Sequence, residues 1–190
     1  MVLEKIEDII KTFYPTSISS LEDYDKYILS SENKKLNNIK SELFQSQKMI
    51  GQIDNIILNV SEYERLKNIE NYTSESFDRC FSLKAEYKEE RHLYQLYIRI
   101  SILAPVYTIY VVSNPIENNP YRWLDTPKRD KDYERIISDE ILILKKVIEN
   151  EINYSFIDKS ILNKIVDDVS YEDVSFGNFS MFNALFTNDI

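Results

Sequence analysis

Few residues of this chain have side chains that usually carry out enzyme chemistry. It contains one histidine, His92, and one cysteine, Cys80, as the candidates for an imidazole base and a thiol nucleophile. Its two glycines, Gly51 and Gly177, lie far apart, whereas phosphate-binding loops and nucleophile turns depend on glycine. This composition is typical of a binding protein, although an AT-rich genome would also explain the scarcity of glycine.

Both candidate catalytic residues have simpler structural interpretations. His92 follows Arg91 in a charged hairpin turn, where a solvated side chain needs no catalytic role. Cys80 is expected on the solvent face of a strand beside Arg79, and a neighbouring cation can lower a thiol pKa. No second histidine is present to complete a catalytic triad. We therefore interpret both residues as structural and predict a protein that is not an enzyme.

Carboxylates are abundant and offer a second route to catalysis. The chain has 32 acidic residues against 23 basic ones, and several acids are neighbours in sequence. Metal-dependent or glycosidic chemistry needs paired carboxylates that converge in a cleft. Neighbouring side chains instead diverge by about 100° on a helix and face opposite sides on a strand. We interpret most of these acids as solvated, and an enzyme with converged carboxylates stays open as an alternative.

One acidic cluster near the C-terminus differs from the others in its density. Four carboxylates and one tyrosine lie within seven residues, and the nearest base is Lys164. Aromatic side chains flanked by acids are typical of a surface that docks onto a cationic protein, although a solvated loop would explain the same residues. The predicted partner-binding residues of this cluster are Asp167, Asp168, Tyr171, Glu172 and Asp173.

A proline-rich loop at 114–130 is a second candidate surface. It contains the single tryptophan of the chain, and Tyr121 and Trp123 are predicted there as anchors for a partner. The alternative is that Trp123 is tucked beneath the loop and holds it in place.

Length and charge restrict the class of protein and of partner. The 190 residues, with 43% hydrophobic and 29% charged residues, suit one folded domain over 1–190 with a helical part at 1–75 and a sheet-containing part at 76–190. The net charge of −9 repels phosphate and anionic lipid, so we expect no nucleic acid, no membrane and a basic protein as partner. One cysteine and the lack of a signal peptide predict a cytoplasmic location. No cofactor or metal is predicted.

Apolar residues in the first part of the chain recur every three to four positions. This period predicts helices at 2–13, from about Ser20, and at 32–59, with Gly51 as a point where the last of these helices could break. The residues that share one side of the second helix are Leu21, Tyr24 and Ile28.

The period changes to two after residue 76, which predicts strands and an α+β fold. We expect a three-stranded antiparallel meander over about 77–112, with one face packed and one face in solvent. The residues expected on the solvent face are Cys80, Ser82, Arg99 and Ser101. Helices over about 130–152 and 158–166 follow, and a short hairpin near 173–178 with an aromatic-rich tail is expected to pack on the sheet.

The segments YQLYIRISILAPVYTIYVV and FGNFSMFNALFTNDI, with a long helix between them, resemble a class of small bacterial immunity proteins over residues 93–190. The resemblance implies an acidic intracellular protein that neutralises a polymorphic or contact-delivered toxin, and it assigns no functional residue. The leading hypothesis is a stoichiometric inhibitor that covers the basic active site of a toxin. The alternative is a structural or adaptor module that forms homo-oligomers through its sheet edges and apolar C-terminus.

Overall fold

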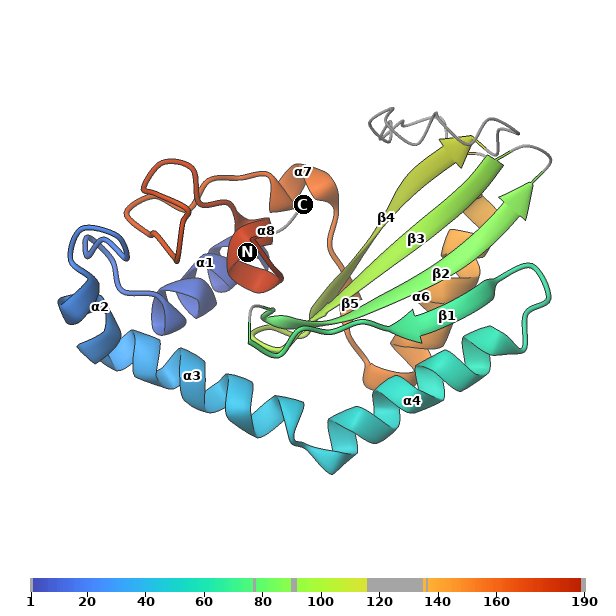
Figure 1. Ribbon diagram of the computed structural model, residues 1–190, viewed down its shortest axis with the longest axis horizontal. Helices are drawn as coiled ribbons and strands as arrows, with labels where there is room; N and C mark the ends of the chain where they lie inside the picture. Colours follow the sequence, from blue (N-terminus) through green and yellow to red (C-terminus); the bar gives the residue numbers. More distant parts are fainter. Residues whose placement is uncertain (1, 77, 90–91, 116–134, 136, 189–190) are drawn as a thin grey trace.

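The computed structural model describes residues 2–76, 78–89, 92–115, 135 and 137–188. It has an α+β fold, as predicted, in which helices surround a five-stranded mixed sheet (Figure 1). The helices are α1 (Val2–Phe13), α2 (Tyr24–Leu29), α3 (Ser31–Phe44), α4 (Gln47–Ser61), α6 (Ser138–Ile152), α7 (Lys159–Leu162) and α8 (Met181–Leu185). The strands are β1 (Lys67–Asn71), β2 (Cys80–Glu89), β3 (His92–Ser101), β4 (Val106–Pro115) and β5 (Ser155–Phe156).

The long helix predicted at 32–59 is two helices, and the break is not at Gly51. Ser30 caps α3 by accepting a hydrogen bond from the Asn33 N–H, and Ser46 caps α4 by accepting one from the Met49 N–H. A serine that satisfies an otherwise unpaired N–H at a helix start favours a new helix at that point. The serine caps therefore set the boundaries, while Gly51 lies within α4.

The sheet has the strand order β1-β2-β3-β4-β5. Strands β1 to β4 pair antiparallel, and β5 pairs parallel with β4. The predicted three-stranded sheet was therefore too small. Strand β1 was missed because its sequence KNIEN has one apolar residue and shows no alternation, and β5 was missed because it is two residues long.

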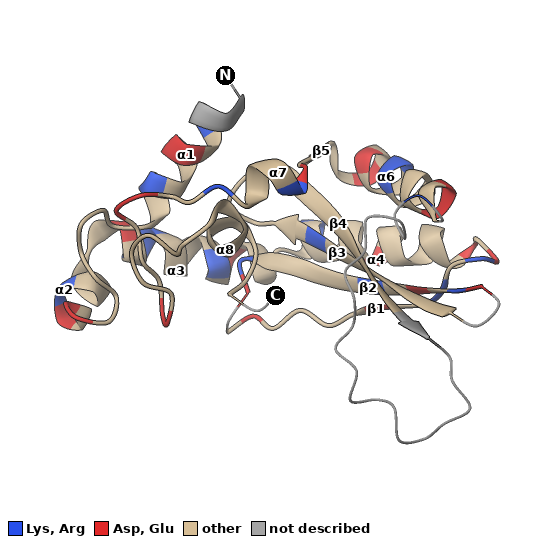
Figure 2. Ribbon diagram, turned by 90° about the horizontal axis from the view of Figure 1, so that it is seen from above, with Lys and Arg blue, Asp and Glu red and all other residues tan. Residues whose placement is uncertain are grey.

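One face of the sheet is apolar and packs against α4 and α6, which lie side by side (Figure 2). Leu83, Ala85, Leu96 and Ile98 on this face are fully buried. At its edge the Tyr107 hydroxyl donates a hydrogen bond of 2.7 Å to the Glu149 carboxylate of α6. The alternation in the sequence correctly indicated this packed face.

The opposite face is not open to solvent at the end where β2 begins, which corrects the prediction. Cys80, Ser82, Arg99 and Ser101 are all buried. The C-terminal segment covers this end of the sheet, and Phe182 of α8 packs edge-on against Tyr110 with ring centroids 6.2 Å apart. Residues that alternate as a solvent-facing row are therefore enclosed by a segment about 80 to 100 positions away in sequence.

The aromatic-rich C-terminal tail packs into the core, as predicted. Phe179, Met181, Leu185 and Phe186 have no exposed surface. These four side chains are therefore not available as the apolar surface of the homo-oligomer that was considered as an alternative. No helix in the described part of the chain has the length and apolarity needed to span a bilayer.

Two buried tyrosines beside the tail differ in their hydrogen bonding and give a matched test of the packing. Tyr14 donates a hydrogen bond of 2.7 Å to the Ala184 carbonyl, whereas the Tyr27 hydroxyl has no hydrogen-bond partner among the described residues. Tyr14→Phe is expected to lower the free energy of unfolding by about 1–2 kcal/mol, because it removes a buried hydrogen bond to the Ala184 carbonyl. Tyr27→Phe is expected to leave it unchanged or raise it, since it removes an unpaired buried hydroxyl. Urea unfolding of both variants measures the difference, and the reverse order would contradict this packing.

Candidate functional site

The predicted acidic cluster forms an exposed loop between α7 and α8. The side chains of Asp167, Asp168, Glu172 and Asp173 are all exposed. The backbone is left-handed at Asp168 (φ 58°) and at Glu172 (φ 52°), a conformation that Asp adopts more readily than most residues. Tyr171 and Val174 exchange two backbone hydrogen bonds of 3.0 and 3.1 Å, which close the loop into a tight turn. The four acidic residues that the sequence indicated therefore lie exposed on one loop.

The acidic loop is fastened to the segment between α1 and α2. The Ser17 N–H donates to the Asp168 carbonyl at 2.8 Å. The Ser20 N–H donates to the Ser170 hydroxyl at 2.8 Å, and the Ser20 hydroxyl donates to the Glu172 carbonyl at 3.1 Å. These bonds join residues about 150 positions apart, so the acidic loop and the start of α2 form one continuous surface.

Tyr171 does not lie on that surface, which corrects its predicted role as a contact residue. It is 7% exposed, and its ring packs edge-on against Tyr14 with a centroid distance of 5.4 Å. The Arg79 guanidinium lies over the Tyr171 ring at 4.7 Å. Burial raises the pKa of Tyr171 to about 12, and the positive charge of Arg79 opposes this increase. The exposed aromatic residue of the region is Phe176, at 40%.

Arg79 supports the acidic loop from the protein core, and no pattern in the sequence indicated this role. Its guanidinium is fully buried and donates to the Asn183 carbonyl and, at 2.8 Å, to the Asn188 Oδ1. The Asn188 Nδ2 in turn donates to Glu172 at 3.0 Å and to Asp173 at 3.2 Å. Two of the four carboxylates are therefore positioned by a chain of hydrogen bonds that begins in the core.

A second buried polar group lies close to Arg79, where β2 begins. Ser82 links Arg99 and Asp78 by hydrogen bonds to both side chains, and the Arg99 guanidinium lies 5.0 Å from the centre of the Tyr72 ring. Cys80 is enclosed here, and burial raises its pKa to about 12. The thiol is therefore protonated and inaccessible at neutral pH, in contrast to the solvent-facing position that the sequence predicted.

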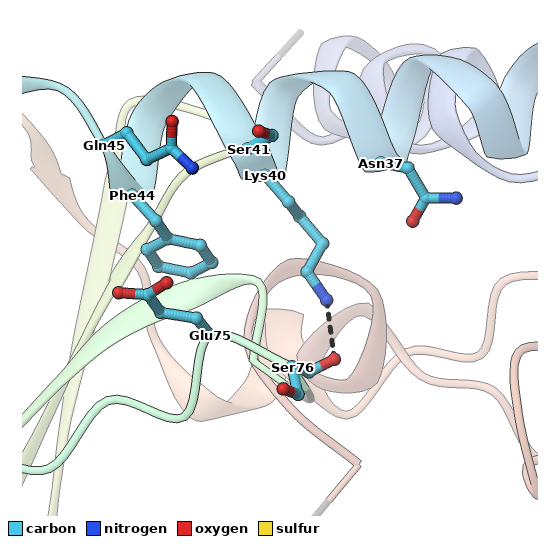
Figure 3. Close-up of a pocket in the computed structure, with 7 residues that line it drawn as sticks. All are labelled: Asn37, Lys40, Ser41, Phe44, Gln45, Glu75 and Ser76. Carbon is cyan, nitrogen blue, oxygen red and sulfur yellow. Dashed lines mark hydrogen bonds between the residues drawn. The ribbon is translucent and has the colours of Figure 1, made fainter.

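An open depression of about 290 Å³ lies between α3 and the segment before β2 (Figure 3). Lys40 reaches across it and donates a hydrogen bond of 3.0 Å to the Ser76 carbonyl. Burial, together with the nearby charge of Arg79, lowers the pKa of Lys40. The seven lining residues include neither histidine nor cysteine, and the lysine amine is engaged in holding α3 to this segment. The depression therefore offers a polar surface feature but no nucleophile with an adjacent base.

The remaining predicted site residues, Tyr121 and Trp123, lie outside the described residues. Within the ranges that are described, no group of three or more histidine, cysteine or carboxylate side chains is arranged to hold a metal ion. Compared with known proteins, the chain matches no family model, no curated sequence and no solved structure.

Proposed function

We propose that this protein is a stoichiometric inhibitor that binds a basic partner protein, in the manner of an immunity protein that neutralises a toxin. It acts by covering the partner's cationic active site with carboxylates and does not transform a substrate. The observation that carries this proposal is that Asp167, Asp168, Glu172 and Asp173 lie exposed on one loop, where Asn188 holds the carboxylates of Glu172 and Asp173.

The rigidity of the loop matters because ordering a flexible segment costs free energy on binding. Here the buried Arg79 and the hydrogen bonds to Ser17 and Ser20 hold the loop before any partner arrives. An acidic surface of this kind increases the rate of association with a basic partner and disfavours acidic competitors. The net charge of −9 acts in the same direction over longer distances.

The partner to test is the product of the reading frame adjacent to the gene for this chain, since immunity proteins are encoded beside their toxins. The double variant that carries both Asp167→Lys and Asp173→Lys tests the loop. These two positions are chosen because neither has the left-handed backbone found at the other two acids of the loop. We expect the association rate of this double variant to fall about tenfold at roughly 50 mM NaCl and less at roughly 300 mM, where screening weakens the attraction.

The matched control is Glu42→Lys with Asp54→Lys, which changes two exposed acids on α3 and α4. Each Asp or Glu to Lys change raises the net charge by two, so both double variants have a net charge of −5 in place of −9. The control is expected to bind nearly as fast as the unmodified protein. Equal losses in the two variants would refute a role for this loop, and the absence of a complex would refute the proposed partner.

A further inference from the structure

Exposed apolar side chains are concentrated in one short segment beside the acidic loop. Nine large hydrophobic residues of the described chain are exposed, and four of them lie within residues 21–29. They are Leu21 at 58%, Tyr24 at 61%, Ile28 at 38% and Leu29 at 66%. Single exposed apolar residues are ordinary, but a group of them in one place marks an interaction surface.

The orientation of α2 explains why these apolar residues are exposed. Tyr27 is the only residue of α2 that is buried, and its ring lies 6.5 Å from that of Tyr171. Leu29 is two positions from Tyr27 and lies on the opposite side of the helix, while Tyr24 and Ile28 are one helical turn apart and lie along one flank, where both are exposed. The packing of α2 through Tyr27 therefore leaves the other apolar residues without cover.

Acidic side chains flank the apolar group. Glu22 and Asp25 are exposed, while Asp23 pairs with Lys26 at 2.9 Å. A red acidic region is visible at α2 in Figure 2. The hydrogen bonds of Ser17 and Ser20 to the acidic loop place Asp168 and Glu172 on the same continuous surface. The apolar residues are thus bordered by carboxylates on their own segment and beside the loop.

We propose that the apolar residues of α2 and the turn before it, named here the α2 patch (Leu21, Tyr24, Ile28 and Leu29), are the anchor of the partner interface. The proposal rests on the proposed function and names the occupant: a protein with an apolar groove bordered by Lys and Arg. Interfaces of this design place apolar anchors at the centre, where they carry most of the affinity, and charges at the rim.

A second copy of this chain is the less suitable occupant. A two-fold contact brings the same patch of each subunit together. Glu22 and Asp25 of one copy would then lie close to the same residues of the other, in a protein whose net charge is already −9. The same acidic residues would attract the Lys and Arg side chains of a basic partner protein.

The test uses two double variants and takes the product of the adjacent reading frame as the probe. The α2 variant carries both Tyr24→Ser and Leu29→Ser, and the control variant carries both Tyr63→Ser and Leu58→Ser. The control residues are also exposed, Tyr63 at 41% and Leu58 at 63%, and lie at the C-terminal end of α4. We expect the α2 variant to weaken the complex about 100-fold, mainly through faster dissociation and at both salt concentrations. The control is expected to stay within about twofold.

Three other outcomes overturn the inference in distinguishable ways. If the complex is weakened by Asp167→Lys with Asp173→Lys but not by the α2 variant, the acidic inhibitor stands and the α2 patch has no role. If the unmodified protein forms no complex, the proposed function fails and the inference fails with it. If the protein sediments as a dimer at about 50 µM and Leu29→Ser makes it a monomer, the occupant is a second copy.

Discussion

Raising the pH to about 11 is expected to unfold this protein, because several acidic protons are held on fully buried groups. Burial raises the pKa of Tyr14, Tyr27 and Tyr171 above the ordinary tyrosine value, and that of the Cys80 thiol to about 12. In the unfolded chain these groups lose their protons near pH 10 and pH 9 respectively.

The direction of the effect follows from which state holds more protons. Above pH 9 the folded protein keeps protons that the unfolded chain releases, so alkaline pH favours unfolding. The stability from these groups is complete below pH 9 and is lost as the pH rises toward the folded pKa values. Together they account for a loss of roughly 7 kcal/mol at pH 11, which is comparable with the whole stability of a typical domain.

Circular dichroism and tyrosinate absorbance, followed together against pH, measure this transition. Loss of structure and ionisation of the buried tyrosines are expected at the same pH. Tyr27→Phe should move the midpoint to higher pH, whereas Tyr63→Phe, at an exposed position, should leave it unchanged. Tyrosines that all ionise near pH 10 in a protein that stays folded would show that these rings are not buried.

Arg79→Met is expected to lower the free energy of unfolding by about 3 kcal/mol and to release the acidic loop. The substitution keeps much of the apolar stem, but it leaves the Asn183 carbonyl and the Asn188 amide oxygen without their donor, and unpaired buried groups are costly. It also removes the cation from the Tyr171 ring. Arg79→Lys should recover only part of the loss, because a lysine cannot reproduce the planar fork of donors.

Urea unfolding gives the stability, and amide hydrogen exchange of residues 167–173 reports on the loop. Exchange in this segment should be faster in Arg79→Met than in the control Arg135→Met, which changes an exposed arginine. Loss of stability without faster exchange in the loop would separate Arg79 from the positioning of Glu172 and Asp173.

Periodic patterns in the sequence were sufficient to predict the α+β class and the packed face of the sheet, while the aromatic-rich composition of the C-terminal tail predicted its burial. The first two features depend on the spacing of apolar residues within one element, and that spacing is visible in the chain itself. The short strands β1 and β5 do not have such a pattern. They exist because a neighbouring strand offers them hydrogen-bonding groups.

In the candidate site, too, some features follow from the local sequence and others only from contacts with distant residues. That Asp167, Asp168, Glu172 and Asp173 are exposed follows from local composition, since several charges in a short stretch favour solvent. That Tyr171 is buried follows from contacts with Tyr14 and Arg79, which lie about 157 and 92 positions away in sequence. No local pattern distinguishes an aromatic side chain that anchors a loop from one that would bind a partner.

The sequence by itself therefore determined the type of the longer, periodic elements and which short stretches are charged. Only the tertiary structure decided which of their faces stay uncovered: α2 turns Tyr27 inward and leaves Tyr24 and Leu29 outside, while the C-terminal segment encloses Arg79 and Cys80. The physical reason is that burial depends on what packs against a face, and the packing partner is supplied by a distant part of the chain.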